Sequence, residues 1–203
     1  DALLTGPIDA LLTGVGQALH EAGANILLGH LPSDEQATIV AAGQIGARLI
    51  ALTPDNPDSL ALQIEAAGEI DIAIIAPHSH LYKPFMEITD AEWDAAISGN
   101  FERALWLSQA IARGWIAGDP TEDLTAKTQR TPRNQNSKRI IFLSSIAARL
   151  PLTHLSAPGT TLGALRALAK MAAVDLAPHG ITINVIELGW VDTPALPAVA
   201  RTH

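Results

Sequence analysis

The chain has 203 residues, of which 48% are hydrophobic, and this is enough to bury one core, so we expect a single domain over residues 1–203. Its net charge of −8 excludes attraction to phosphate backbones and anionic lipid, so we expect no nucleic-acid partner and no membrane partner. It has no Cys, which excludes disulfides and thiolate metal ligands and is consistent with a cytoplasmic protein.

Short apolar runs alternate with longer helical patterns from the first residues onward. The runs are apolar on both faces, as strands covered by helices on both sides should be. They predict strands within residues 1–6, 24–30, 47–53, 70–77, 138–145 and 181–188. Helical patterns cover about 10–22, 33–43, 58–68, 89–117 and 157–177.

This steady alternation predicts an α/β fold: a Rossmann-like, doubly wound parallel sheet flanked by helices. Thr89 and Glu92 have the spacing of a capping box at the start of the fourth helix. Residues 118–138 are polar and lack apolar periodicity, so we expect a surface loop there.

Several stretches, taken together, resemble the short-chain dehydrogenase/reductase family from Asp1 to about Pro194. They are LLTG, HEAGANILL, EIDIAII, FMEITDAEWDAAISGNF, RIIFLSSIAARLPL, LSAPG and LGALRALAKMAAVDLAPHGITINVIELGWVDTPA. The resemblance implies the Rossmann-like fold and a place among NAD-dependent oxidoreductases. Family members usually continue well beyond the last of these stretches, so we expect the C-terminal part of this chain to be short or missing.

The family's first loop, T-G-x-x-x-G-x-G, lets the backbone approach the cofactor diphosphate at a helix N-terminus. This chain keeps Thr5 and Gly6 but has Ala10 and Leu12 in place of the next two glycines. We expect Leu12 to place a branched side chain where the phosphate or the packed helix would lie. Asp9 adds a negative charge beside the same position.

Two further cofactor positions differ from the family pattern. Thr53 stands where the resemblance implies an aspartate that holds the adenine, and residues 75–78 replace the family's Asn-Asn-Ala-Gly. The pair Gly14 and Gly16 falls inside the first predicted helix and does not restore the loop. We therefore predict no cofactor.

The resemblance implies a catalytic Ser, a Tyr thirteen residues later and a Lys four residues beyond it. Counting from Ser145, the Tyr position is Pro158 and the Lys position is Leu162, and neither side chain can transfer a proton. Pro158 suits the first turn of a helix, while Leu162 joins an apolar face. That face also includes Leu165, Ala169 and Ala172.

Ser145 and Asn100 resemble the remaining catalytic positions of the family. We interpret both as structural, with Ser145 capping or bracing the strand end and Asn100 bonding the backbone of its own helix, because a hydroxyl without a base is a poor nucleophile. His78 and His80, with Lys83 after them, lie at the sheet edge where ligands bind in such folds, and His154 could enter the same cleft. We predict no catalytic residue and no metal ligand.

The leading hypothesis is a subunit that is inactive on its own and assembles with an active dehydrogenase. It resembles the non-catalytic partner in heteromeric short-chain dehydrogenases, whose active partner would act on a hydroxyacyl-CoA-type or other alcohol substrate. The helices over 89–117 and 157–177 would form the contact with that relative or with a second copy, although the same apolar residues could only fill the core. Two alternatives stay open: a divergent enzyme using His78 or Ser145 in the old cleft, and a small-molecule sensor.

Overall fold

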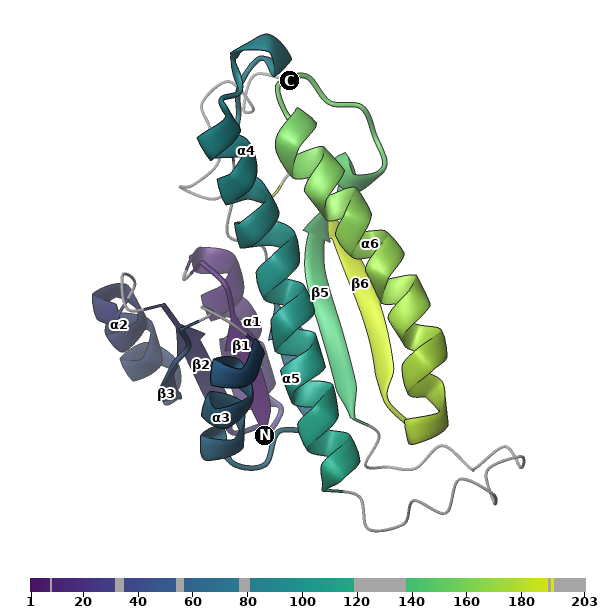
Figure 1. Ribbon diagram of the computed structural model, residues 1–203. Helices are drawn as coiled ribbons and strands as arrows, with labels where there is room; N and C mark the ends of the chain where they lie inside the picture. Colours follow the sequence, from purple (N-terminus) through teal and green to yellow (C-terminus); the bar gives the residue numbers. More distant parts are fainter. Residues whose placement is uncertain are drawn as a thin grey trace.

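The computed structural model describes residues 1–7, 9–31, 35–53, 57–76, 81–118, 138–189 and 191. Strands and helices alternate along these ranges as the sequence predicts (Figure 1). The strands are β1 (Ala2–Thr5), β2 (Ile26–His30), β3 (Arg48–Ala51), β4 (Ile72–Ile75), β5 (Arg139–Ser145) and β6 (Thr182–Leu188). The predicted polar loop over 118–138 lies almost wholly outside the described residues.

The helices begin and end within two residues of their predicted bounds. They are α1 (Ala10–Glu21), α2 (Glu35–Ile45), α3 (Pro57–Ala67), α4 (Asp90–Ile97), α5 (Arg103–Ala117) and α6 (Ser156–Leu176). A π-helical turn, Ser98–Glu102, joins α4 to α5, so the long helix predicted over 89–117 is continuous but widened at its centre. The capping box at the start of α4 is present, with Thr89 and Glu92 bonding each other's backbone N–H groups.

All neighbouring strands are parallel, in the order β3-β2-β1-β4-β5-β6. The order reverses between β1 and β4, so the carboxyl ends of these two strands form the crevice in which doubly wound sheets bind ligands. The prediction of a Rossmann-like, doubly wound α/β fold is confirmed.

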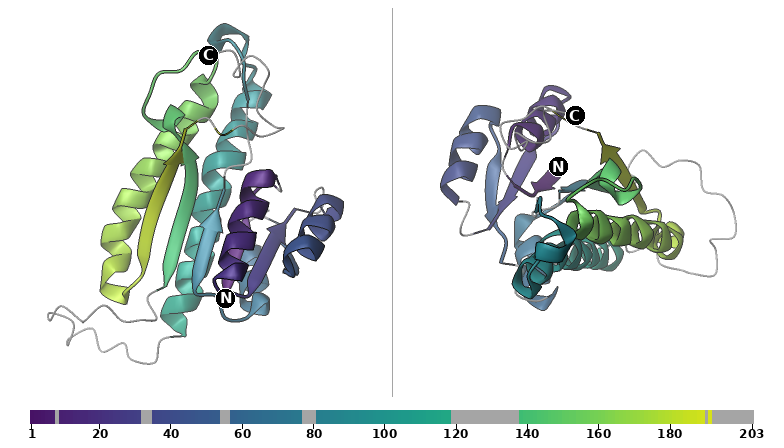
Figure 2. Two further views of the ribbon diagram at one scale, coloured as in Figure 1. Left: turned by 180° about the vertical axis from the view of Figure 1, so that it is seen from behind. Right: turned by 90° about the horizontal axis from the view of Figure 1, so that it is seen from above.

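Helices lie on both faces of the sheet around β1, β2 and β4, whose residues are almost all buried (Figure 2). The outer strands β3 and β6 have exposed residues, so the expectation of strands covered on both sides holds for the centre of the sheet. Leu3 packs on the side of α3, α5 and α6, and Leu4 packs on the side of α1 and α2; both side chains are fully buried. Burying a leucine of this kind contributes about 1.5–3 kcal/mol. No helix within the described ranges is both long and apolar enough to cross a membrane.

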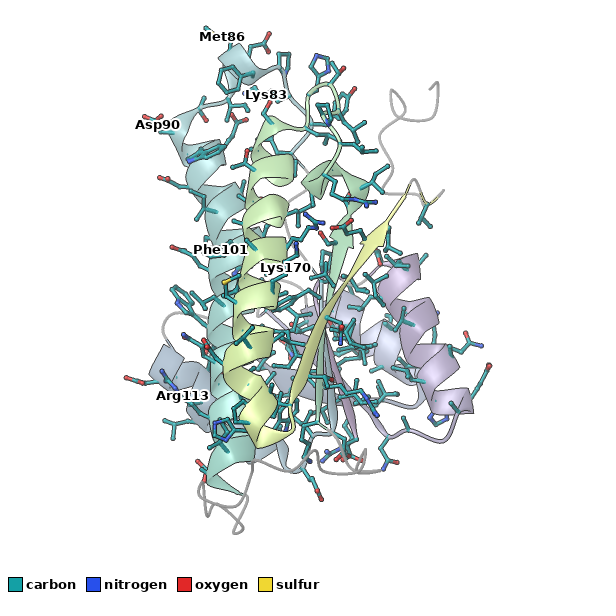
Figure 3. The ribbon with its side chains drawn as sticks, turned by 90° about the vertical axis from the view of Figure 1, so that its right-hand side faces the viewer. Lys83, Met86, Asp90, Phe101, Arg113 and Lys170 are labelled. Carbon is teal, nitrogen blue, oxygen red and sulfur yellow. The ribbon has the colours of Figure 1, made fainter. Side chains whose placement is uncertain are left out.

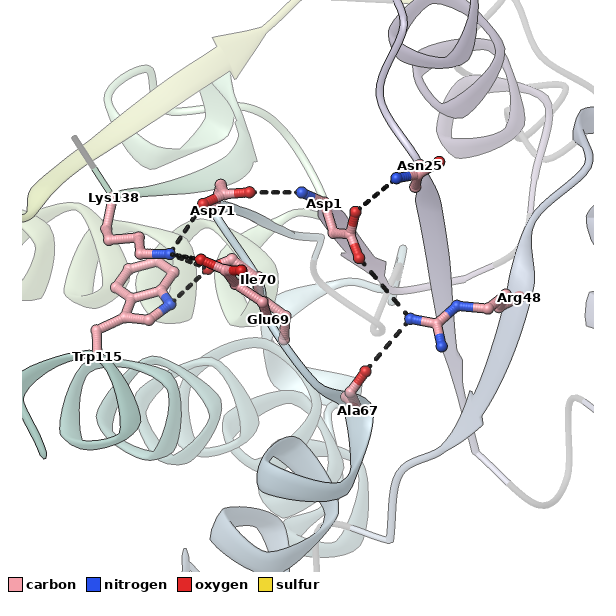
Figure 4. Close-up of polar contacts among 9 residues, drawn as sticks. All are labelled: Asp1, Asn25, Arg48, Ala67, Glu69, Ile70, Asp71, Trp115 and Lys138. Atoms are coloured by element: carbon pink, nitrogen blue, oxygen red, sulfur yellow. Dashed lines mark hydrogen bonds and ion pairs between the residues drawn. The ribbon is translucent and has the colours of Figure 1, made fainter. Parts of the chain in front are cut away.

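Polar contacts fasten the amino-terminal edge of the sheet (Figure 4). Lys138, just before β5, donates to Asp71 at 2.8 Å and to the carbonyl of Ile70 at 2.9 Å. The Trp115 indole of α5 donates to the same carbonyl at 2.7 Å. Lys138, followed by the N-terminal amine, lowers the pKa of the Asp71 carboxyl by bonding its charged form.

Candidate functional site

The turn after β1 lies at the crevice between β1 and β4. Gly6 has φ +149°, and a Cβ atom there would lie 2.5 Å from the Cβ of Ala76 at the end of β4. Both the dihedral angle and the lack of space require glycine. The backbone therefore turns tightly from β1 into the segment that leads to α1, as a diphosphate-binding loop must.

The first turn of α1 is capped by an acid. The Asp9 carboxylate accepts a hydrogen bond from the backbone N–H of Leu12 at 2.9 Å, so a negative charge already lies at the helix N-terminus. Ala10, at the first position of α1, is exposed. An approaching anion would compete with the Asp9 carboxylate for the N–H groups of this turn.

The Leu12 side chain lies in the packing between α1 and the sheet, one of the two positions that we expected for it. It is 1% exposed and packs in the core with Leu4 and Leu28, beneath the helix rather than in the crevice. Of the two positions that we expected for this side chain, the structure shows the packing between helix and sheet and not the phosphate position, because the helix turns the side chain toward the sheet.

Gly16 has a role that the sequence analysis missed. A Cβ atom at Gly16 would lie 2.8 Å from Cδ1 of Ile45 and 3.4 Å from Cδ2 of Leu4, so this glycine lets α1 pack closely on the sheet and on α2. Close helix packing of this kind is one purpose of glycines in dinucleotide-binding units. The Gly14-Val15-Gly16 stretch was the available signal.

Thr53, two residues after β3, is held by α3. Its backbone N–H donates to Oε1 of Gln63 at 2.9 Å, and the Gln63 amide nitrogen bonds the Thr53 hydroxyl. The position thus presents an amide and a hydroxyl instead of a carboxylate. Nothing in the sequence pattern singled out Gln63, because its partner is ten residues away on another element.

The catalytic positions of the fold hold packing and capping residues. The Ser145 hydroxyl accepts from the backbone N–H of Ala147 at 3.2 Å and so caps the short 3-10 turn Ile146–Ala148. Pro158 is buried in the first turn of α6, and Leu162 is 4% exposed within the core. Neither carries a group that can exchange a proton.

Asn100 makes a contact that we did not expect. It is fully buried in the π-helical turn, and its Nδ2 donates across to the hydroxyl of Thr161 on α6 at 3.0 Å. The Thr161 hydroxyl in turn lies 3.0 Å and 3.1 Å from the carbonyls of Ala157 and Pro158. Asn100 therefore braces α6 beside Leu162, and our interpretation that it bonds the backbone of its own helix did not include this contact.

His154 lies beyond the ends of β4 and β5, in a cluster with Tyr82, Lys83 and Glu92. It has φ +65°, its carbonyl accepts from the N–H of Lys83 at 2.9 Å, and its ring meets that of Tyr82 edge to face at 5.1 Å. Lys83 reaches both carboxylate oxygens of Glu92 at 2.8 Å. Within the described residues no hydrogen bond or ring contact joins His154 to Ser145.

His78 and His80 lie outside the described residues. Across the ranges that are described, no three His, Asp or Glu side chains come close enough together to hold a metal ion. The absence of a metal site stays a prediction.

A parallel sheet in this strand order, with a glycine turn and a helix N-terminus at the point of reversal, defines a Rossmann-like domain. The chain belongs to the short chain dehydrogenase family, whose model matches residues 2–203.

Known relatives cover nearly the whole chain. L-xylulose reductase from Bos taurus is 27% identical over 194 residues, which span 95% of this chain and 72% of the reductase. Sorbitol dehydrogenase from Cereibacter sphaeroides is 27% identical over 201 residues, spanning 94% of this chain and 70% of that enzyme. Among solved structures, BdcA in complex with NADPH aligns with a TM-score of 0.77 and 22% identity, covering 97% of this chain and 73% of BdcA.

These comparisons overturn our prediction of no cofactor. BdcA, whose fold aligns with 97% of this chain, was solved in complex with NADPH, and this chain is a member of a dehydrogenase family. The prediction was wrong because it counted changed side chains, whereas the Gly6 turn and the N–H groups of the first turn of α1 are backbone features. These features fit a diphosphate, and Asp9 is the acid it would meet there.

Proposed function

We propose that this chain is a non-catalytic member of the short-chain dehydrogenase family that binds a nicotinamide dinucleotide and assembles with an active relative or with a second copy. The observation that carries the proposal is the pair Pro158 and Leu162, both buried in α6. Reduction of a carbonyl needs a proton donor beside the hydride donor. A pyrrolidine ring and an isobutyl group supply none.

Dinucleotide binding is supported by the turn at Gly6 and by the helix N-terminus that follows it. The dinucleotide would supply or accept a hydride in an active relative. In this chain, the Gly6 turn and the first turn of α1 would hold its diphosphate, and the Asp9 carboxylate would weaken that contact through like charge.

Assembly is supported by the outer face of α6, which lies beside the α4–α5 helix (Figure 3). Met171 is 64% exposed and Val174 is 71% exposed, one helical turn apart. Ala164 and Ala167 are exposed on the preceding two turns. This face offers small and apolar side chains against which a second helical layer could pack.

Calorimetric titration with NADPH and NADP⁺, paired with an NADPH oxidation assay, tests the proposal. L-xylulose and a panel of ketones and aldehydes serve as substrates. We expect saturable binding without turnover. Turnover above the background rate would contradict the non-catalytic assignment and direct attention to a divergent enzyme, and absence of binding would contradict the dinucleotide part. The cytoplasmic location stays a prediction.

A further inference from the structure

The carboxyl ends of β2 and β3 lie side by side, at the same edge of the sheet as the turn after β1. The register pairs His30, the last residue of β2, with Ala51, the last residue of β3. The Leu52 N–H continues this ladder by donating to the His30 carbonyl at 2.8 Å. Thr53 is therefore the first residue beyond the ladder.

A nucleotide on this half of the sheet would bring its base toward Thr53. Each half of a doubly wound sheet binds one mononucleotide, with the diphosphate at the turn after the first strand and the ribose at the end of the second, about 20 residues later. In this chain these places are the Gly6 turn and the His30 end of β2. The base extends beyond the ribose, and therefore toward the end of β3. This step rests on the dinucleotide binding proposed above.

Gln63 fixes the direction of the hydrogen bonds at Thr53. The Thr53 backbone N–H donates to Oε1 of Gln63 at 2.9 Å, and because a backbone N–H can only donate, the other end of the amide is the nitrogen. That Nε2 bonds the Thr53 hydroxyl and lies 3.2 Å from Oγ of Ser59. An amide N–H donates, so the Thr53 oxygen is the acceptor in this contact.

The Thr53 hydroxyl thus keeps its own proton for another partner. In the part of the chain that the structure describes, no group accepts a hydrogen bond from it, and the side chain is half-buried. Its partner Gln63 is held in place by α3, whose Leu60 and Ile64 are packed in the core. The end of β3 therefore presents a positioned hydrogen-bond donor.

We propose that the Thr53 hydroxyl donates to the group at position 6 of the purine base, which projects from the far end of the base. A dinucleotide that carries hypoxanthine has an oxygen there, which accepts. Adenine has an amino group, which donates and would meet an oxygen that already accepts from Gln63. The chain therefore binds the hypoxanthine form more tightly than the adenine form.

Calorimetric titration with NADP⁺ and with nicotinamide hypoxanthine dinucleotide phosphate tests the proposal. The two compounds have the same charge and nearly the same shape, so the ratio of their dissociation constants isolates the base. We expect the hypoxanthine form to bind about three- to tenfold more tightly, because one net hydrogen bond distinguishes the two bases.

Three variants locate the effect. Gln63→Glu keeps the shape of the side chain, but its carboxylate accepts from both the N–H and the hydroxyl of Thr53, so the preference should reverse toward adenine. Thr53→Val removes the hydroxyl, and the ratio should approach one. Gln44→Glu adds the same charge at an exposed position on α2 and is the matched control, expected to keep the ratio of the parent.

Equal affinity of the parent for the two forms, or a preference for adenine, would overturn this inference and leave dinucleotide binding intact. Retention of the parent's ratio in Thr53→Val would do the same, and this comparison does not depend on the folding of Gln63→Glu. An equal change of the ratio in Gln63→Glu and Gln44→Glu would show an effect of charge without a contact to the base. Absence of binding by both forms would overturn the dinucleotide part of the proposed function, and this inference with it.

Discussion

Two buried polar side chains, those of Asn100 and Thr161, lie beside Pro158 and Leu162. The bond from Asn100 to Thr161 crosses from the π-helical turn to α6, and both residues are at least 96% buried. A buried donor left without its acceptor costs about 1–3 kcal/mol. We therefore expect this contact beside Pro158 and Leu162 to contribute to stability.

Thr161→Val should lower the free energy of unfolding by about 1–3 kcal/mol, because it removes the acceptor while keeping the shape of the side chain. Urea unfolding measures the change. Thr161→Ser keeps the hydroxyl and should cost less than the valine variant. A valine variant as stable as the parent would show that the bond does not hold α6.

Asp9→Ser should tighten NADPH binding about two- to fivefold, since a charge at a helix N-terminus contributes about 0.3–1 kcal/mol. Serine also caps helices, so the free energy of unfolding should change by less than about 0.5 kcal/mol. Calorimetry measures the affinity. Asp90→Ser removes an acid from the start of α4, and an equal gain in that control would count against a local effect.

Among the elements, α4 begins at a capping box that includes the charged carboxylate of Glu92. Lys83 and Thr89 lower the pKa of Glu92 from 4.5 to about 2 by bonding its ionised carboxylate. Because the folded pKa lies below the unfolded one, this contribution to stability is complete above about pH 4.5 and is lost as the pH falls toward 2.

Glu92→Gln should be less stable than the parent at pH 6, and the difference should shrink as the pH falls from 4.5 toward 2. Urea unfolding at pH 6, 4 and 3 measures it. A difference that stays constant with pH would show that the ionised carboxylate contributes nothing beyond the capping hydrogen bonds.

The elements themselves could be predicted from the sequence, because strands such as β1, with Leu3 and Leu4, are apolar on both faces and alternate with longer helical patterns, one of which begins at the capping box of Thr89 and Glu92. The widened turn at Ser98–Glu102 could not, since it leaves the apolar pattern unchanged. The roles of Leu12, Gly16 and Gln63 depend on contacts with other elements. Residue spacing along one segment does not contain that information.

At the scale of the whole molecule, the assembly that we propose would use the face formed by α6 and α4–α5. Met171→Glu/Val174→Glu places two charges on that face and should reduce self-association, which light scattering after size exclusion measures. Leu62→Glu, on α3 and 69% exposed in the parent, is the control and should keep the parent mass. A parent protein that is monomeric at all concentrations would contradict assembly with a second copy.

The Ile70 carbonyl receives hydrogen bonds from Trp115, near the end of α5, and from Lys138, just before β5. The fold thereby holds Trp115 and Lys138, the two ends of the segment between α5 and β5, at the same carbonyl group. Closing a longer connection between fixed ends costs only about 0.6 kcal/mol for each doubling of its length. Evolution, or an experimenter inserting a fluorescent reporter, can therefore lengthen the chain there while the sheet and its two layers of helices stay in register.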